Sequence, residues 1–149
     1  MLISGLSALH IVSPFGMRVR NGQEEFHPGV DLRVYDRNID PGATNILPIE
    51  SPEKMKITAI NLSTKWGHEI LAEVSEKNPL GIIQFCFWHI KPIEGICEVG
   101  AELDEGTIFA TPESGYVDLH LHFQTNIDYR GFTAIDPTKY FKYRRWAYA

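Results

Sequence analysis

Asp118-Leu119-His120-Leu121-His122-Phe123, near the C-terminus, is the stretch that decides the fold. Apolar and polar residues alternate in it with a period of two, which is typical of a β-strand with one buried face. The pattern puts His120 and His122 on one face, with their Cβ atoms about 7 Å apart. Two imidazoles on one face can bind a metal ion together, or one can bind it while the other contacts what the ion holds. Two unrelated histidines on a solvated sheet face are the alternative.

The rest of the chain also shows β-strand patterns rather than helical ones. Strands are expected at residues 17–20, 30–34, 55–61, 69–75, 82–90 and 108–110. Asn21-Gly22 predicts a tight hairpin turn after the first of these. Residues 136–141 are expected to close the domain, with 142–146 as a final strand or an amphipathic end. We therefore predict an all-β fold of antiparallel sheets that form a groove.

Length, composition and charge limit the possible classes of protein. The 149 residues fit one domain, 1–149, with 44% hydrophobic and 22% charged residues. A net charge of -5 argues against a general nucleic-acid or anionic-membrane binder. No apolar run approaches the roughly 20 residues that span a bilayer, and residues 1–6 lack the features of a signal peptide. Cys86 and Cys97 are not in metal-ligand spacing, so we expect two free buried thiols.

Three other histidines and one long segment stand out. Pro28 and Gly29 exclude a helix around His27 and Asp31, so this pair belongs to a turn that leads into a strand. His89 ends an apolar strand, where a core histidine is the alternative to a functional one. His68 follows a turn and is expected to be an exposed polar residue. Residues 35–52 are polar and predict a long surface loop at a binding rim.

Taken in order along the chain, these motifs resemble those of the lysostaphin-type zinc endopeptidases, which cut peptide cross-links of peptidoglycan and have the duplicated-hybrid-motif fold. The matching segments are SPFGMR (13–18), FHPGVD (26–31), WG (66–67), WHI (88–90), HLHF (120–123) and DP (136–137). The resemblance therefore extends over nearly the whole chain, in an H-x-x-x-D … H … H-x-H order.

The resemblance implies a division of roles among five residues. His27, Asp31 and His122 would be the ligands of Zn²⁺, and His89 and His120 would be catalytic histidines that do not bind the metal. Two histidines and one carboxylate leave a position of Zn²⁺ open, which suits a catalytic site. No H-E-x-x-H motif is present, so imidazole must act as the general base. Periodicity alone does not say which of His120 and His122 binds the metal.

The sequence also departs from the family pattern at the site. Asp118 stands where the family has glycine, and Gln124 stands where it has glutamate. Asp118 could accept a hydrogen bond from a histidine, intrude on the substrate groove, or be a solvated edge carboxylate. Residues 31–56 lack the usual small-residue pattern. These departures bear on substrate preference and rate, while all five site residues are present.

The resemblance implies a zinc metalloendopeptidase that acts outside the cytoplasm on peptides of the bacterial cell wall. Without a visible signal peptide, a phage lysin, a virion component or a domain excised from an exported protein is expected. The alternative is a catalytically weak or inactive member of the fold that acts as a binding, structural or regulatory module. A peptidase of another fold with the same His/Asp/His ligands is a third possibility, against which SPFGMR and the β pattern argue.

Overall fold

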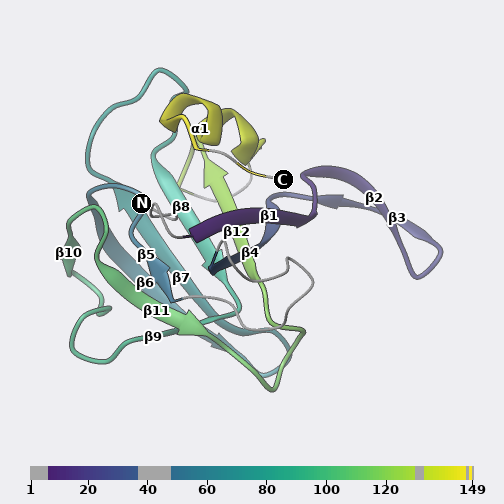
Figure 1. Cartoon of the computed structure of the whole chain (residues 1–149), viewed down its shortest axis with the longest axis horizontal. Helices are drawn as coiled ribbons and strands as arrows, with labels where there is room; N and C mark the ends of the chain where they lie inside the picture. The colour runs from purple at the N-terminus through teal and green to yellow at the C-terminus, as the bar shows by residue number, and fades with distance from the viewer. Residues whose placement is uncertain (1–6, 37–47, 130–132, 147, 149) are drawn as a thin grey trace.

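An antiparallel β-sheet dominates the computed structural model, which describes residues 7–36, 48–129, 133–146 and 148 (Figure 1). Within these residues the sheet has eight strands in the order β1-β4-β12-β8-β7-β6-β10, with β13 paired to β12. The strands are β1 (Ser7–Ser13), β4 (Val30–Asp36), β6 (Met55–Ser63), β7 (Gly67–Val74), β8 (Gln84–Trp88), β10 (Glu102–Leu103), β12 (Leu121–Asn126) and β13 (Ala134–Ile135). The prediction of an all-β fold of antiparallel sheets is confirmed.

Two smaller sheets complete the described architecture. One pairs β5 (Ile49–Glu50), β11 (Ile108–Pro112) and β9 (Ile90–Pro92). The other is the hairpin of β2 (Gly16–Arg20) and β3 (Gln23–His27), which projects from the body of the molecule (Figure 1). Asn21 and Gly22 at its tip both have positive φ, 52° and 76°, as the predicted turn requires. Most of the predicted loop 35–52 lies outside the described residues.

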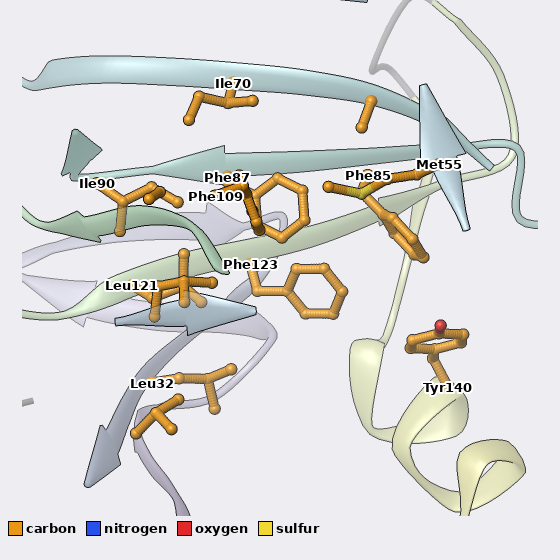
Figure 2. Close-up of a cluster of buried hydrophobic side chains, with 14 of the residues drawn as sticks. Leu32, Met55, Ile70, Phe85, Phe87, Ile90, Phe109, Leu121, Phe123 and Tyr140 are labelled. Carbon is orange, nitrogen blue, oxygen red and sulfur yellow. The ribbon is translucent and has the colours of Figure 1, made fainter. Parts of the chain in front are cut away.

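Alternation along the central strands separates a core face from a site face. In β4, Val30, Leu32 and Val34 are almost fully buried, whereas Asp31 and Arg33 point the other way and are half-buried. On the core face, Phe85 and Phe87 of β8 pack against Phe123 of β12 with ring centroids 5.4 Å apart (Figure 2). Each fully buried ring stabilises the fold by roughly 1.5–3 kcal/mol. The core therefore fixes the register of the strands that carry the site.

The C-terminal segment is a helix, so the expectation of a final strand at 142–146 was wrong, whereas the alternative of an end packed on the sheet agrees with the burial of Trp146. The helix α1 (Pro137–Arg144) begins at Asp136, whose side chain accepts a hydrogen bond from the Thr138 N–H at 2.9 Å. An acidic N-cap followed by proline is a strong helix start, and this signal was present in the sequence. Tyr140 and Phe141 are both buried and close the core, and Figure 2 shows Tyr140 on α1 beside Phe85 and Phe123.

Two differences between the predicted and the observed strands bear on the site. The apolar stretch 82–90 is not one strand, because β8 ends at Trp88 and Ile90 belongs to β9 of the small sheet. His89 lies at the bend between them with a φ of +70°. Strand β12 begins at Leu121, so His120 precedes the strand that alternation predicted to contain it.

Cys86 and Cys97 are free and buried, as predicted. None of the helices among the described residues has the length and apolarity needed to cross a membrane.

Candidate metal centre and groove

Strands β3, β4 and β12 bring His27, Asp31 and His122 to one point on the site face. Asp31 and His122 are directly opposite each other in the antiparallel pairing of β4 and β12. His27 ends β3, and Pro28 and Gly29 turn the chain directly into β4. Pairing across strands thus places residues together that are 91 positions apart in sequence.

The three facing atoms form a compact triangle. His27 Nε2 lies 3.2 Å from His122 Nδ1 and 3.3 Å from Asp31 Oδ1, and His122 Nδ1 lies 3.2 Å from Asp31 Oδ1. In a tetrahedral zinc site with bonds of about 2.0–2.2 Å, neighbouring donor atoms lie about 3.3–3.6 Å apart. The donor set, two imidazole nitrogens and one carboxylate oxygen, is also one that Zn²⁺ favours. The three side chains therefore fit a zinc ion.

Gly29 allows this close approach. A Cβ atom at this position would lie 2.5 Å from the Phe123 carbonyl oxygen and 2.8 Å from His122 Nε2. Contacts this short are not tolerated, so a side chain here would displace the His122 ring or separate β12 from the turn. Gly29, between His27 and Asp31, is therefore needed because a side chain would collide with β12 and the His122 ring.

Hydrogen bonds fix which ring nitrogen of His27 and His122 faces the triangle. His27 donates from Nδ1 to the Pro14 carbonyl at 2.8 Å, which leaves Nε2 to face the triangle. His122 has the opposite arrangement, because its Nε2 donates to Gln124 Oε1 at 3.3 Å and its Nδ1 faces Asp31. Second hydrogen bonds of this kind orient metal-binding histidines.

Gln124 belongs to a buried chain of amides behind His122. Its Nε2 donates to Asn126 Oδ1 at 2.8 Å, and Asn126 Nδ2 donates to Gln84 Oε1 at 2.8 Å. Each amide oxygen in this chain accepts a hydrogen bond from the residue nearer to His122. The NH2 groups of Gln124 and Asn126 each donate to the residue farther from it. This order keeps Gln124 Oε1 pointed at His122 Nε2. In the sequence Gln124 stands out only as a departure from the family pattern, and no local signal predicts its contact with His122.

His120 and His89 lie beside the triangle, with ring centroids 4.6 Å apart. His120 donates from Nδ1 to the Asp118 carbonyl at 2.6 Å, and its Nε2 is 3.6 Å from Asp31 Oδ1. His89 donates from Nδ1 to the Trp66 carbonyl at 2.8 Å. The Asp118 side chain is exposed, and its backbone rather than its carboxylate orients His120.

Burial affects the charges of Asp31 and His89 differently. Burial alone would raise the pKa of Asp31, but hydrogen bonds from His122 and His27 outweigh it and hold the pKa below its ordinary value. Arg18 Nη1 also lies 3.4 Å from Asp31 Oδ2. For His89, burial lowers the pKa from 6.5 to about 4, and the bond to Trp66 opposes this only in part. At neutral pH, Asp31 is ionised and His89 is neutral.

His68 and Glu113 form a pair that the sequence did not predict, and both bond to the backbone of His89. His68 Nδ1 lies 2.5 Å from Glu113 Oε2 and the His68 side chain is only 21% exposed, so the expectation that His68 is an exposed polar residue was wrong. Glu113 also accepts from the His68 N–H at 2.8 Å, and its own N–H donates to the His89 carbonyl at 3.2 Å. The His89 N–H in turn donates to the His68 carbonyl at 3.1 Å. The pairing joins residues 45 apart, and no local pattern indicates it.

The five predicted site residues all line one groove of about 650 Å³. Trp66 and Trp88 contribute apolar surface, and Arg18, Arg20 and Arg33 contribute positive charge. A groove of this size, with apolar walls and a few convergent polar groups, is typical of a binding site for a small molecule or an extended peptide.

Comparison with known proteins identifies the fold. No family model and no curated protein matches this chain. Among solved structures, the catalytic domain of the antimicrobial peptidase lysostaphin from Staphylococcus simulans is 24% identical with a TM-score of 0.57, and the match covers 89% of each chain. A zinc-containing peptidase from Vibrio cholerae is 17% identical with a TM-score of 0.63, over 90% of this chain and 37% of that one. A chain of the SpoIIIAH–SpoIIQ complex is 12% identical with a TM-score of 0.64, over 93% and 95%.

The chain therefore has the lysostaphin-type peptidase fold that its motifs suggested. At these identities the likeness concerns the fold, and the chemistry must be argued from the side chains of this chain.

Proposed function

We propose that this protein is a zinc-dependent endopeptidase that hydrolyses peptide cross-links of bacterial peptidoglycan. The observation that carries the proposal is the triangle of His27 Nε2, Asp31 Oδ1 and His122 Nδ1, with edges of 3.2–3.3 Å. The fold, shared with lysostaphin, supports the same reaction class. Residues 1–149 would form a single metallopeptidase domain.

His27, Asp31 and His122 would hold the zinc ion. When bound, Zn²⁺ supplies the Lewis acidity that activates water and polarises a carbonyl at neutral pH. The ionised Asp31 carboxylate contributes the negative charge that a divalent cation needs, and the two histidines already turn His27 Nε2 and His122 Nδ1 toward it. The ligands are thus arranged before the metal binds.

His89 and His120 would act directly on the reacting atoms. Both donate from Nδ1 to a backbone carbonyl, so each neutral ring presents Nε2 as a base. One can take a proton from the attacking water, and the protonated ring can then donate a hydrogen bond to the oxyanion or a proton to the leaving amine. The lowered pKa of His89, about 4, keeps its ring neutral at pH 7.

The groove supports an extended peptide as substrate. Trp66 and Trp88 provide surface for a peptide backbone, and Arg18 and Arg20 of the projecting β2–β3 hairpin also line the groove. Cell-wall peptide is the proposed partner, with no role for nucleic acid or membrane insertion. We propose that the protein acts on the wall from outside the cytoplasm, as a phage lysin, a virion component or part of an exported protein.

A second candidate is a binding or regulatory module without catalysis. The match to a chain of the SpoIIIAH–SpoIIQ complex favours it, since the same fold there forms part of an assembly. Both candidates predict a folded groove, but only the peptidase needs the zinc ligands.

The test is digestion of purified walls of several cross-link chemistries by zinc-reconstituted protein. We expect the wild type to release new amino termini from at least one wall, and His122→Ala to bind less zinc and release none. Release by His122→Ala equal to that of the wild type would contradict the zinc assignment. Protein that takes up no zinc on reconstitution and cleaves no wall would favour the binding module.

A further inference from the structure

The three arginines of the groove differ in how their charges are balanced. Arg18 donates from Nε to Glu25 Oε1 at 2.8 Å and from Nη1 to Ser13 Oγ at 2.8 Å. It also reaches Asp31 Oδ2 at 3.4 Å. Arg20 is half exposed, has Nη1 4.0 Å from Glu25 Oε1, and places its guanidinium 5.8 Å from the centre of the Trp66 ring. Both cations already face an acidic partner within the protein.

In the part of the chain that the structure describes, Arg33 has no such partner. Among the residues that the structure describes, no carboxylate oxygen comes within 4.0 Å of its guanidinium nitrogens. The acidic residues that line the groove are Asp31 and Asp118, and neither forms an ion pair with it there. A half-buried cation without a counter-charge costs free energy that a ligand anion would offset.

The position of Arg33 relates this charge to the reacting centre. It follows Asp31 by two residues on β4 and lies on the same face of the sheet, so the two Cα atoms are about 7 Å apart. Its Nε donates to the Leu119 carbonyl at 3.3 Å, in the residue that precedes His120. This bond holds the Nε side of the Arg33 guanidinium against the segment that carries His120. The Nη1 and Nη2 groups remain as further donors.

We propose that Arg33 binds a free carboxylate of the substrate, about one residue from the bond that is cut. A guanidinium binds a carboxylate through two parallel hydrogen bonds, which adds position as well as attraction. The preferred substrates are then peptides with a free carboxylate beside the scissile bond, in preference to uncharged glycyl bridges. The role of Arg33 in substrate preference rests on the proposed peptidase function, whereas binding of a carboxylate by Arg33 does not itself require catalysis.

The experiment uses two short peptides of the same sequence, one with a free C-terminal carboxylate and one with a C-terminal amide. Dissociation constants are measured by calorimetry on zinc-free protein, and kcat/KM on zinc-loaded protein. We expect the wild type to bind and cleave the carboxylate peptide about 10- to 100-fold better than the amide. Arg33→Gln weakens binding and cleavage of the carboxylate peptide far more than those of the amide and so removes the preference, and Arg33→Lys retains part of it.

Lys56→Gln is the matched control, because it removes one positive charge from an exposed position of β6 outside the groove lining. It should keep the wild-type preference. Equal dissociation constants for the two peptides in the wild type, including no measurable binding of either, would overturn the inference. So would equal losses for both peptides in Arg33→Gln. A preference in binding that Arg33→Gln abolishes, with no cleavage of either peptide, would support Arg33 and count against the peptidase.

Discussion

Hydrogen bonds to the ring nitrogens determine what each histidine at Asp31 can do. His27, His89 and His120 each donate from Nδ1 to a backbone carbonyl and therefore present Nε2. His122 donates from Nε2 to Gln124 and presents Nδ1. The geometry favours His122 over His120 as the metal ligand, because His122 Nδ1 is 3.2 Å from His27 Nε2 as well as from Asp31. The sequence pattern left this choice open.

Replacing His89 and Asp31 by alanine should separate catalysis from metal binding. We expect His89→Ala to keep about one zinc per chain and to lose about 10²- to 10⁴-fold in kcat, because only a proton-transfer group is removed. Asp31→Ala should lose both zinc and activity, since it removes the carboxylate ligand. Metal analysis beside wall digestion measures both. Equal zinc contents in the two variants would refute this division of roles.

The amide chain behind His122 should control zinc affinity. Gln124→Leu leaves His122 Nε2 and Asn126 Oδ1 without their partner in a buried site, so we expect zinc to bind about 10- to 100-fold more weakly. Gln124→Glu also removes the donor to Asn126 but keeps an acceptor for His122 Nε2, so as the matched control it should bind zinc more tightly than Gln124→Leu. Competition with a chelator of known affinity gives the constants. Wild-type affinity in Gln124→Leu would show that the contact has no such role.

At the scale of elements, three segments meet at His89. The chain passes there from the large sheet to the small one, and the residue adopts φ +70°, which costs a non-glycine residue roughly 1–2 kcal/mol. Backbone bonds to His68 on β7 and to Glu113 next to β11 hold it in place. Gly67 has φ +83°, and a Cβ there would lie 2.4 Å from Glu113 Oε1. The contact between the start of β7 and the Glu113 carboxylate therefore requires glycine at position 67.

The N-cap of α1 should contribute to stability without affecting the metal site. Asp136→Ala removes the side-chain acceptor for the Thr138 N–H, so we expect the free energy of unfolding to fall by about 1 kcal/mol. Lys142→Ala, at an exposed position of the same helix, should change it by less than about 0.5 kcal/mol. Urea unfolding of the zinc-free proteins measures both. A loss in Asp136→Ala no larger than in Lys142→Ala would show that the cap is not needed.

At the scale of the whole molecule, alternation along strands predicted most of the fold. Val30, Leu32 and Val34 were correctly placed opposite Asp31, because burial on one face leaves a period of two in the sequence. The convergence of His27, Asp31 and His122 came from resemblance to known motifs, since strand order is not visible in local patterns. Sheet pairing brings them together in the structure. The pairing of His68 with Glu113 depends on contacts between distant segments and had no local signal.

The most direct test of a zinc ion held by side chains from distant strands is X-ray anomalous scattering at the zinc edge, from crystals of zinc-reconstituted protein. The account predicts one strong peak per chain, within about 2.0–2.2 Å of His27 Nε2, Asp31 Oδ1 and His122 Nδ1. A crystal in which zinc binds elsewhere, or in which these three side chains bond only to one another and to backbone at saturating zinc, would contradict it.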